Sequence, residues 1–481
     1  MIDAETLPLT DLAEAHDVGT PAGAPPGLLE ALHRRFGLRF CGGPALDERL
    51  GAGRPAGVPV RLDGMVFAHS TEEVAEVVRL CALHRVPVSA FGARASVERH
   101  ALAEQGGIAL DLSEMNEVLT INVQDLTATV QAGVSRSQLN AEVKDTGLFF
   151  PVDPGAEASL GGMAATRASG TNAVRYGTMR ENVLALTVVT AEGKVIRTAR
   201  RAKKSSAGYD LTRVFVGSEG TLGIITEVTL RLCPRPDAIA TAVCSFPDVR
   251  GVVDTVIQTL QVGVPVARAE FLDGLALRAV NQHCGTGFTE RPTLFLEFHG
   301  TAAGVAEQAE TVRDIAAEHR GDDYQWADEP QQRARLWEAR HTAFQACCRL
   351  KPGWQTLTTD ACVPLSRLAQ CLEETLDDNR RSHLLCPVFG HIGDGHFYCM
   401  MISDPEKPDE VAEAQRLNQR LMRRAMRMDG TCTAEHGMGA HKVVLLSEEF
   451  DSDAVQLMRQ LKRAWDPLNI MNPGKVVSFP E

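Results

Sequence analysis

The residues from Pro151 to Gly177 could allow the main chain to bind an anion. They read PVDPGAEASLGGMAATRASGTNAVRYG, with adjacent glycines at Gly161 and Gly162 and a run of Ala, Ser, Thr and Gly. Such small residues let backbone N–H groups approach a ligand closely, which suits a pyrophosphate with two negative charges. A surface loop without a ligand is the alternative, but a loop this long in a compact domain is more often functional. We therefore predict a phosphate-binding loop here.

The composition argues against several classes of partner and metal site. The 481 residues carry a formal net charge of -13, which disfavours nucleic acid or an anionic membrane surface as a partner. No apolar run approaches the roughly 18 residues of a membrane-spanning helix. The twelve cysteines contain no CxxC, so the usual zinc-ribbon and iron–sulfur spacings are absent from the sequence, and a reducing compartment is expected.

Residues 1–57 are predicted to form a helical and extended N-terminal segment, with one helix over Gly27–Phe36. Its glycines at 51, 53 and 57 do not have the GxGxxG spacing of a dinucleotide fingerprint. The first seventeen residues have neither the apolar core of a signal peptide nor the Arg/Ser bias of a transit peptide. We therefore expect a cytoplasmic protein, or one in the mitochondrial matrix or at the inner membrane if a presequence has been removed.

Residues 58–236 have the pattern of an α+β domain. Ser70 and Glu73 are spaced as a capping box before a helix, and a strand at Val86–Ala90 would complete a β-α-β unit. Further strands are predicted at Ile108–Leu112, Thr127–Gln131, Leu184–Thr190, Lys194–Thr198 and Ile224–Leu232. The strands at 184–190 and 194–198 flank a turn and should form a hairpin.

The pattern changes after the Pro-Arg-Pro of residues 234–236. Strands at Thr241–Phe246 and Thr293–His299 alternate with amphipathic helices such as Val305–His319, which predicts a second α+β domain over 237–430. Residues 431–481 are predicted to contain a helix at Ser452–Trp465 and to return to the site formed by the first domain.

Several motifs together resemble a known family. Pro151–Gly177 and the residues VGSEGTLGIIT at 216–226 resemble the flavin domain of the vanillyl-alcohol oxidase / para-cresol methylhydroxylase (PCMH) superfamily. EARH at 338–341, GHIGDG at 390–395, GTCTAEHG at 430–437 and NPGK at 472–475 resemble the C-terminal domain of FAD-linked, cytochrome-reducing D-lactate dehydrogenases. Related 2-hydroxyglutarate and glycolate dehydrogenases share much of this pattern. The resemblance implies a two-domain α+β flavoprotein, with a bipartite PCMH-type FAD-binding domain and an α+β cap domain for the substrate.

The resemblance also implies a cofactor, a substrate and residue roles. FAD would lie between the two halves of the first domain, against Gly92, Ser96, Pro154, Gly155, Gly161, Gly162, Ser169, Gly170, Thr171, Gly220, Gly223, Ile225 and Asn472. Arg340 would bind the carboxylate of a D-2-hydroxy acid such as D-lactate. His436 would remove the hydroxyl proton while a hydride passes to flavin N5, because an imidazole with a pKa of about 6.5 suits a general base. Electrons would then pass to cytochrome c, a quinone or an electron-transfer flavoprotein, and a homodimer is one expected assembly.

The implied metal site departs from the family pattern. Relatives read His-x-Gly-Asp-Gly-Asn-x-His and add a carboxylate from Glu-His-Gly, and a divalent ion such as zinc or manganese would polarise the substrate hydroxyl. Here His391 and Glu435 remain, but His396 replaces the Asn and Tyr398 replaces the second His. A phenol with a pKa of about 10 is a poor ligand unless it is ionised. His396 is therefore the candidate third ligand, although it lies two residues short and would require the turn to rearrange.

A second departure lies in the loop that follows the strand at Val86–Ala90. Arg94 and Arg99 occupy positions where relatives usually carry glycine. Their side chains would either fill the pyrophosphate site or bind the phosphates themselves.

Three functions are compatible with these residues. The first is an active FAD-dependent D-2-hydroxy acid dehydrogenase, which the retained loop at 151–177, Arg340, Glu435 and His436 favour. The second is a catalytically impaired relative that serves as a binding or assembly subunit, which Tyr398 and the altered loop at 92–100 favour. The third is an oxidase that uses O₂ on another hydroxylated substrate without a metal. The number of retained motifs favours the first.

Overall fold

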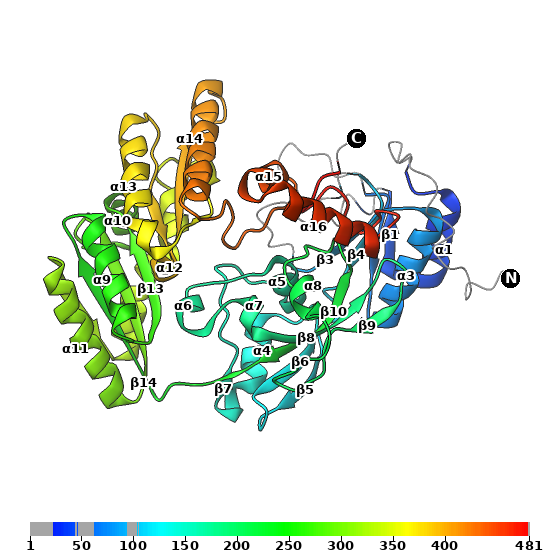
Figure 1. Cartoon of the computed structure of the whole chain (residues 1–481), viewed down its shortest axis with the longest axis horizontal. Helices are drawn as coiled ribbons and strands as arrows, with labels where there is room; N and C mark the ends of the chain where they lie inside the picture. The colour runs from blue at the N-terminus through cyan, green and yellow to red at the C-terminus, as the bar shows by residue number, and fades with distance from the viewer. Residues whose placement is uncertain (1–22, 44–45, 47–61, 94–102, 104, 480–481) are drawn as a thin grey trace.

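The computed structural model describes residues 23–43, 46, 62–93, 103 and 105–479. They form an N-terminal part with two main sheets, a C-terminal part with one large sheet, and a last segment that crosses back to the N-terminal part (Figure 1). This arrangement agrees with the predicted two-domain α+β class. Among the described helices, none is both long and apolar enough to cross a bilayer.

The first sheet contains the predicted β-α-β unit. Its strand order is β1 (Phe40–Gly42), β2 (Gly64–Phe67), β4 (Ile108–Asp111) and β3 (Val88–Phe91), and the last three are parallel. Buried parallel strands need a covering layer. Helices α1 (Pro26–Phe36) and α3 (Thr71–His84) supply it with leucine and valine side chains.

Helix α3 begins with half of the predicted capping box. Ser70 Oγ accepts the N–H of Glu73, as expected. The Glu73 carboxylate does not return to the Ser70 N–H, however, but accepts the His69 N–H and pairs with Arg39. The hydrogen bond from Arg39 lowers the pKa of Glu73 to about 2. A tertiary ion pair has therefore displaced the second local bond.

The second sheet is antiparallel throughout. Its order is β5 (Val118–Asn122), β6 (Thr127–Gln131), β10 (Ile224–Arg231), β8 (Val183–Val189) and β9 (Val195–Arg197). Strands β8 and β9 form the predicted hairpin. A two-stranded ribbon pairs β7 (Leu148–Phe149) with β11 (Cys233–Pro234). The connections in this part of the chain contain short helices: α4 (Arg136–Val143), α5 (Leu160–Thr166), α6 (Ala173–Tyr176), α7 (Met179–Asn182) and α8 (Leu211–Phe215).

The prediction of a continuous loop over 151–177 was wrong in part. Helices α5 and α6 lie within it, and Leu160, Met163 and Ala164 of α5 are buried in the core against β10. Small residues therefore let α5 approach the sheet closely, in addition to leaving room for a ligand.

The C-terminal part is built on one antiparallel sheet. The order is β15 (Asp322–Ala327), β12 (Ala238–Ser245), β14 (Thr293–Gly300), β13 (Val266–Leu272), β18 (Val388–Gly390), β19 (His396–Ser403) and β16 (Gln355–Thr358), with β17 (Ala361–Cys362) paired to β19. Helices α9 (Val249–Gln261), α11 (Ala302–Glu318), α13 (Leu365–Arg381) and α14 (Pro408–Arg427) cover one face. Helices α10 (Gly274–Cys284) and α12 (Pro330–Cys348) cover the other. Apolar residues therefore alternate between the two cores along β12, β13, β14, β18 and β19.

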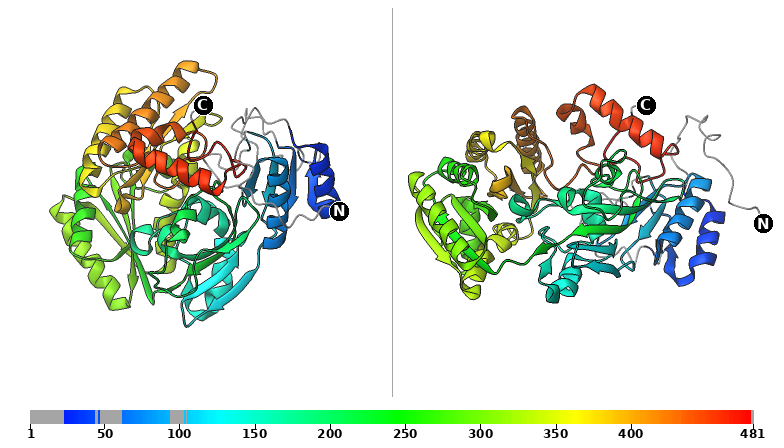
Figure 2. Two further views of the ribbon diagram at one scale, coloured as in Figure 1. Left: turned by 45° about the vertical axis from the view of Figure 1, so that its right-hand side comes forward. Right: turned by 60° about the horizontal axis from the view of Figure 1, so that its bottom comes forward.

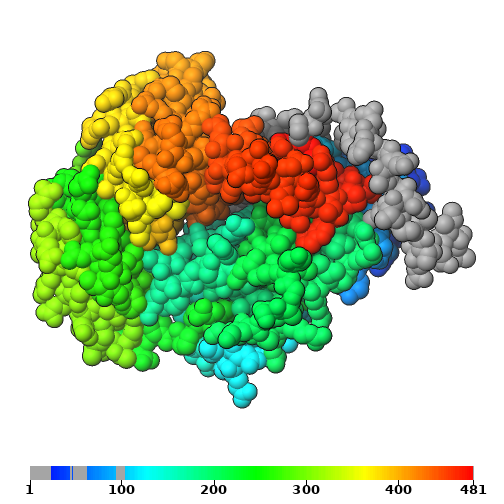
Figure 3. All heavy atoms as spheres, in the orientation of Figure 1, coloured from blue at the N-terminus to red at the C-terminus, as the bar shows by residue number. Residues whose placement is uncertain are grey.

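The last segment of the chain packs against the N-terminal part. After α15 (Leu446–Glu449), helix α16 (Ser452–Trp465) lies over the N-terminal part, as the red helix shows in two further views (Figure 2) and on the molecular surface (Figure 3). Trp465 stacks on Phe215 at 4.9 Å between ring centroids. Beyond α16, Val88 of β3 donates to Ile470 O at 2.7 Å and accepts the Asn472 N–H at 2.8 Å. The NPGK motif is thereby fixed to the edge of the first sheet.

Candidate active site

Ionisable side chains of the C-terminal part cluster beside a loop residue of the N-terminal part. They come from β13, α12, the turn between β18 and β19, β19 itself, the residues before β17, and the segment 431–442. From the N-terminal part, Ser169 joins them.

A buried carboxylate holds two of the predicted site residues. Glu270 of β13 has no exposed side-chain surface, and its two oxygens accept Arg340 Nε and His391 Nδ1, each at 2.7 Å. Although burial opposes its ionisation, His391 and Arg340 lower the pKa of Glu270. Burial likewise opposes the charged form of His391, but Glu270 and Glu435 raise its pKa to about 10. Glu270 thus fixes the ring of His391 and directs Nε2 toward the rest of the cluster.

Tyr398 lies between two predicted metal ligands. Its hydroxyl donates to Glu435 Oε1 and lies 3.4 Å from His391 Nε2. Burial, reinforced by the Glu435 carboxylate, raises the pKa of Tyr398 well above its usual value. The phenol therefore stays protonated and acts as a donor. The second Glu435 oxygen accepts the hydroxyl of Ser169, which links the two parts of the chain.

His396 reaches the cluster without any rearrangement of the turn, which corrects the prediction. His396 and Tyr398 are alternate residues of β19, so their side chains project from the same face of the strand, with ring centroids 4.6 Å apart. One ligand atom each from His391, His396 and Glu435 can be chosen so that all three lie within 4.8 Å of one another. A position two residues earlier in a strand is one step along the same face.

Asp360 is the second buried carboxylate of the cluster. Its Oδ1 lies 3.0 Å from His396 Nε2, and its Oδ2 lies 3.8 Å from His436 Nδ1 and 3.5 Å from Lys442 Nζ. Although burial opposes ionisation, His436, His396 and Lys442 hold the pKa of Asp360 far below its usual value. The His436 ring in turn stacks on Tyr398 at 5.7 Å. Asp360 therefore faces both the candidate base and a candidate ligand.

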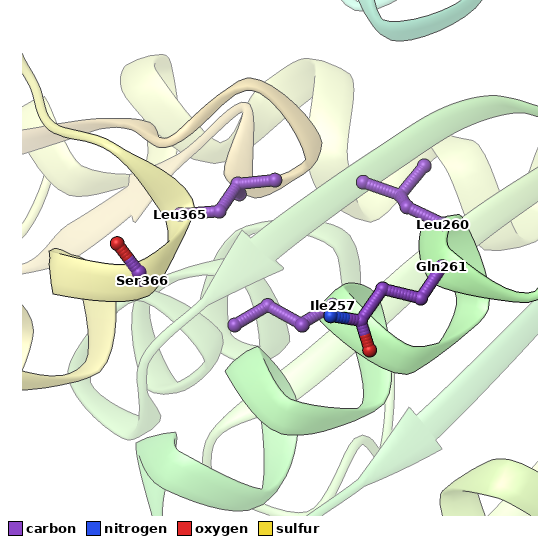
Figure 4. A pocket seen from close by; sticks show the side chains of 5 residues that line it. All are labelled: Ile257, Leu260, Gln261, Leu365 and Ser366. Carbon is purple, nitrogen blue, oxygen red and sulfur yellow. The ribbon is translucent and has the colours of Figure 1, made fainter.

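A cavity elsewhere in the molecule lacks the titratable side chains expected of an active site. A space of about 370 Å³ between α9 and α13 is lined by Ile257, Leu260, Gln261, Leu365 and Ser366 (Figure 4). None of these residues is titratable, and none belongs to the cluster described above. The candidate active site is therefore the cluster.

Comparison with family models identifies the chain. Residues 235–476 match the C-terminal domain of FAD linked oxidases, and residues 62–199 match an FAD binding domain. The chain belongs to the FAD-linked oxidase family. It is an FAD-dependent oxidoreductase of the D-lactate dehydrogenase-like type, as the motifs predicted.

The match to named relatives covers most of this chain. It is 49% identical over 422 residues to the probable mitochondrial D-lactate dehydrogenase of Danio rerio, covering 87% of this chain and 85% of the relative. It is 44% identical over 438 residues to the mitochondrial D-lactate dehydrogenase (cytochrome) of Arabidopsis thaliana, covering 90% of this chain and 77% of the relative.

Solved structures show the same fold at low identity. The 4-ethylphenol oxidase of Gulosibacter chungangensis, in its isoeugenol complex, matches with a TM-score of 0.76 at 18% identity, covering 96% of this chain and 99% of that one. Substrate-bound p-cresol methylhydroxylase matches with a TM-score of 0.71 at 16% identity, covering 95% of this chain and 98% of that one. The predicted PCMH-type fold is confirmed.

Several glycines predicted to contact FAD also have a packing role in this chain. A Cβ added to Gly161 would lie 2.5 Å from the Cβ of Ala132, and one added to Gly170 would lie 2.2 Å from Asp153 O. Gly223 is similarly close to β8. By contrast, a Cβ at Gly155 would meet nothing within 4 Å, and one at Gly220 would meet only Asn472, at 3.9 Å. Open space beside small residues fits a pyrophosphate held by backbone N–H groups.

Other predicted FAD residues have protein partners. Ser169 donates to Glu435, Thr171 donates to Asp153, and Asn472 bonds to Ser89 and to the Glu219 carbonyl. A Cβ added to Gly92 or Gly162 would lie close to the Ser159 side chain. Pro154 directly precedes Gly155 in the chain, and Ile225 is a core residue of β10. Their contact with FAD stays a prediction. Ser96, Arg94 and Arg99 lie outside the described residues.

Sequence reasoning missed the carboxylates that organise the site. Glu270 and Asp360 stand in strand and loop contexts with no motif of their own. Glu270 is 70 residues from Arg340 and 121 residues from His391 in the chain, and Asp360 is 76 residues from His436. No local signal connects such partners.

Arg268 was missed for the same reason, and it joins the two parts of the chain. It donates to Asn172 Oδ1 at 2.9 Å and to Asp153 Oδ2 at 3.2 Å, and it lies 3.5 Å from Glu297 Oε1. Burial raises the pKa of Asp153, and Arg268 opposes that rise. Nearby, Arg175 of α6 also joins the two parts, because its Nη1 donates to the carbonyls of residues 265 and 299.

We expect Arg268→Met to lower stability by about 3 kcal/mol near pH 8, because it leaves a buried carboxylate without its cation. The pKa of Asp153 should rise further, and a native acid with a raised pKa loses stability as pH rises. The loss should therefore shrink when the pH is lowered from about 8 toward about 5. Thermal unfolding across that range measures it, with Arg250→Met, which removes an exposed ion pair with Glu373, as the control. A deficit that does not depend on pH would contradict this account.

Proposed function

We propose that this protein oxidises a D-2-hydroxy acid of the D-lactate type to the 2-oxo acid and delivers the electrons to a cytochrome. The observation that carries the proposal is its 49% and 44% identity to D-lactate dehydrogenases over most of the chain. The name of the Arabidopsis thaliana relative includes the cytochrome, and both names include a mitochondrial location. We therefore also propose a mitochondrial location, instead of the cytoplasmic one that the N-terminal residues suggest.

Arg340 is the proposed binding group for the substrate carboxylate. Glu270 holds its Nε, and its guanidinium lies over the Phe389 ring at 5.6 Å. Both contacts restrict the side chain, so the two terminal nitrogens present a fixed pair of donors. A planar guanidinium can bind a carboxylate with two parallel bonds, which an ammonium cannot do.

His436 is the proposed base for the substrate hydroxyl. Its Nδ1 faces Asp360, a geometry that favours the tautomer with the proton on Nδ1 and leaves Nε2 to accept a proton. Stacking on Tyr398 restricts the ring further. Bound FAD would supply the acceptor for the Cα hydride. The chain's own contribution is to orient the hydroxy acid and to remove one proton from it.

We also propose a divalent metal site formed by His391, His396 and Glu435. Nitrogen and oxygen donors of this kind suit zinc or manganese, and each donor has a partner behind it: Glu270, Asp360 and Ser169 respectively. The ion would polarise the substrate hydroxyl. The Tyr398 hydroxyl lies among these donors, so it must move aside or remain as a neighbour of the ion.

The purified protein should be yellow, and anaerobic D-lactate should bleach its flavin absorbance at about 450 nm, because the flavin accepts two electrons from the substrate. L-lactate is the matched control, because only the configuration at Cα differs. Flavin that stays oxidised with every D-2-hydroxy acid would reject the dehydrogenase and favour an impaired relative. Rapid reoxidation by O₂ without a cytochrome would favour an oxidase.

Arg340→Lys should raise KM and lower kcat/KM for D-lactate by about 10- to 100-fold, because one charge-assisted bond of the pair is lost. Steady-state kinetics with a cytochrome or an artificial acceptor measure the effect. Arg335→Lys makes the same substitution at an exposed position of α12 and should behave like the wild type. Unchanged kinetics in Arg340→Lys would remove this residue from the substrate site.

If the proposed metal site exists, EDTA-treated protein should take up about one Zn²⁺ or Mn²⁺ per chain. Elemental analysis measures the uptake, and a rise in melting temperature should accompany it. His391→Ala should abolish the uptake. Tyr398→His should tighten it, because an imidazole replaces a protonated phenol beside the same donors. Equal metal content in the wild type and His391→Ala would show that the ion is bound elsewhere.

A further inference from the structure

The segment that carries His436 is held from the C-terminal part by Asp360. This carboxylate accepts the N–H of Glu435 at 3.2 Å and the N–H of His436 at 2.8 Å. The carbonyl of Asp360 also accepts the N–H of Ala434 at 3.1 Å. Three consecutive residues are therefore attached to one residue, and His436 is the last of them.

The same segment is held from the N-terminal part by Glu219. The carboxylate of Glu219 accepts the N–H of Met438 at 2.7 Å and the N–H of Gly439 at 2.9 Å. These amides begin two residues after His436. The backbone on either side of the candidate base is thus bound to two buried residues, one from each part of the chain.

Glu219 adopts a backbone conformation that its side chain disfavours. Its φ is +53°, in the left-handed region, and it stands between Ser218 and Gly220 in the second flavin motif. Its own N–H donates to Ala165 O at 2.8 Å, and its carbonyl accepts Asn472 Nδ2 at 2.7 Å. A glycine would suit this φ better, so the presence of glutamate points to a role for the carboxylate.

We propose that Glu219 is a positioning residue for the catalytic base. Its carboxylate sets the path of residues 436–439 and thereby holds His436 at the distance that proton removal requires. The inference rests on the proposed function of His436, but the contact itself does not. Because Glu219 belongs to the predicted flavin-binding motif, the same residue would align the base with the cofactor side of the site.

A purely structural role for Glu219 and a positioning role predict different effects of its substitution. If Glu219 only held the two parts together, its loss would lower the melting temperature or the FAD content, and activity would fall with them. If it positions His436, kcat should fall in protein that keeps its FAD and its melting temperature. Substrate binding should change little, because Arg340 is held by Glu270 and not by this segment.

The test is Glu219→Gln in the full-length holoenzyme. The amide has nearly the same volume but only one acceptor oxygen, so one of the two N–H groups loses its partner. We expect kcat with D-lactate to fall about 10- to 100-fold while KM changes by less than about twofold, as for a misaligned reacting group. The deuterium isotope effect with D-lactate labelled at Cα should also rise, because the chemical step becomes slower.

A second measurement does not depend on activity. Hydrogen exchange of a peptide covering residues 433–442 should be several-fold faster in Glu219→Gln than in the wild type. If wild-type flavin is not reduced by D-lactate, the proposed function fails, and this exchange measurement alone decides whether the contact exists. Unchanged exchange would overturn the inference in either case.

Asp273→Asn is the matched control. Asp273 is also a buried carboxylate that accepts a backbone N–H, that of Ala276 at 2.7 Å at the start of α10. Its substitution should leave kcat within about twofold of the wild type and hydrogen exchange at 433–442 unchanged, because it does not contact that segment.

Three outcomes in Glu219→Gln would overturn the proposal: unchanged kcat, a fall in kcat that follows loss of FAD, or a fall that Asp273→Asn reproduces. If Glu219→Gln does not fold, Glu219→Asp keeps the charge and shortens the side chain by one methylene. The same fall in kcat at constant FAD content is then expected, and its absence would count against the proposal.

Discussion

A buried carboxyl group stays ionised only where cations or N–H donors surround it, and this constraint shapes the candidate site. An unpaired charge in the interior costs several kcal/mol, so Glu270, Asp360 and Glu219 each need partners on other segments. Glu270 joins β13 to α12 and to the turn after β18. Asp360 joins the residue before β17 to β19 and to the base-bearing segment. These buried carboxylates therefore connect the segments of the site, because each takes its partners from other parts of the chain.

The same constraint explains how Tyr398 fits into the cluster at a position where the family pattern has histidine. The family pattern places an imidazole at the position of Tyr398, and this chain supplies a phenol that remains protonated. A protonated phenol can donate to Glu435, and it does. Two residues earlier on the same face of β19, His396 brings an imidazole to the cluster, and its Nε2 lies 3.0 Å from Asp360 Oδ1. The cluster therefore still contains two imidazoles, those of His391 and His396, beside the Glu435 carboxylate.

Small residues in the flavin-binding motifs serve two purposes. Gly161, Gly170 and Gly223 permit close contact between segments of the chain, whereas Gly155 and Gly220 leave open space. A composition rich in glycine, alanine and serine does not distinguish these cases, because both require the absence of a side chain. For this reason composition predicts a single loop from Pro151 to Gly177, although α5 within it packs into the core.

The class, the family and several of the strands could be predicted from the sequence, because alternation, capping residues and ordered motifs are local signals. The hairpin of β8 and β9, the β-α-β unit and helix α16 were all predictable in this way. Only the tertiary structure placed Glu219, Glu270 and Asp360 beside residues that are far away in the chain. Their roles come from pairing across that distance, and no short window of sequence contains both members of such a pair. Local chemistry could name the candidate base and ligands, but the burial of charge decided how they are held.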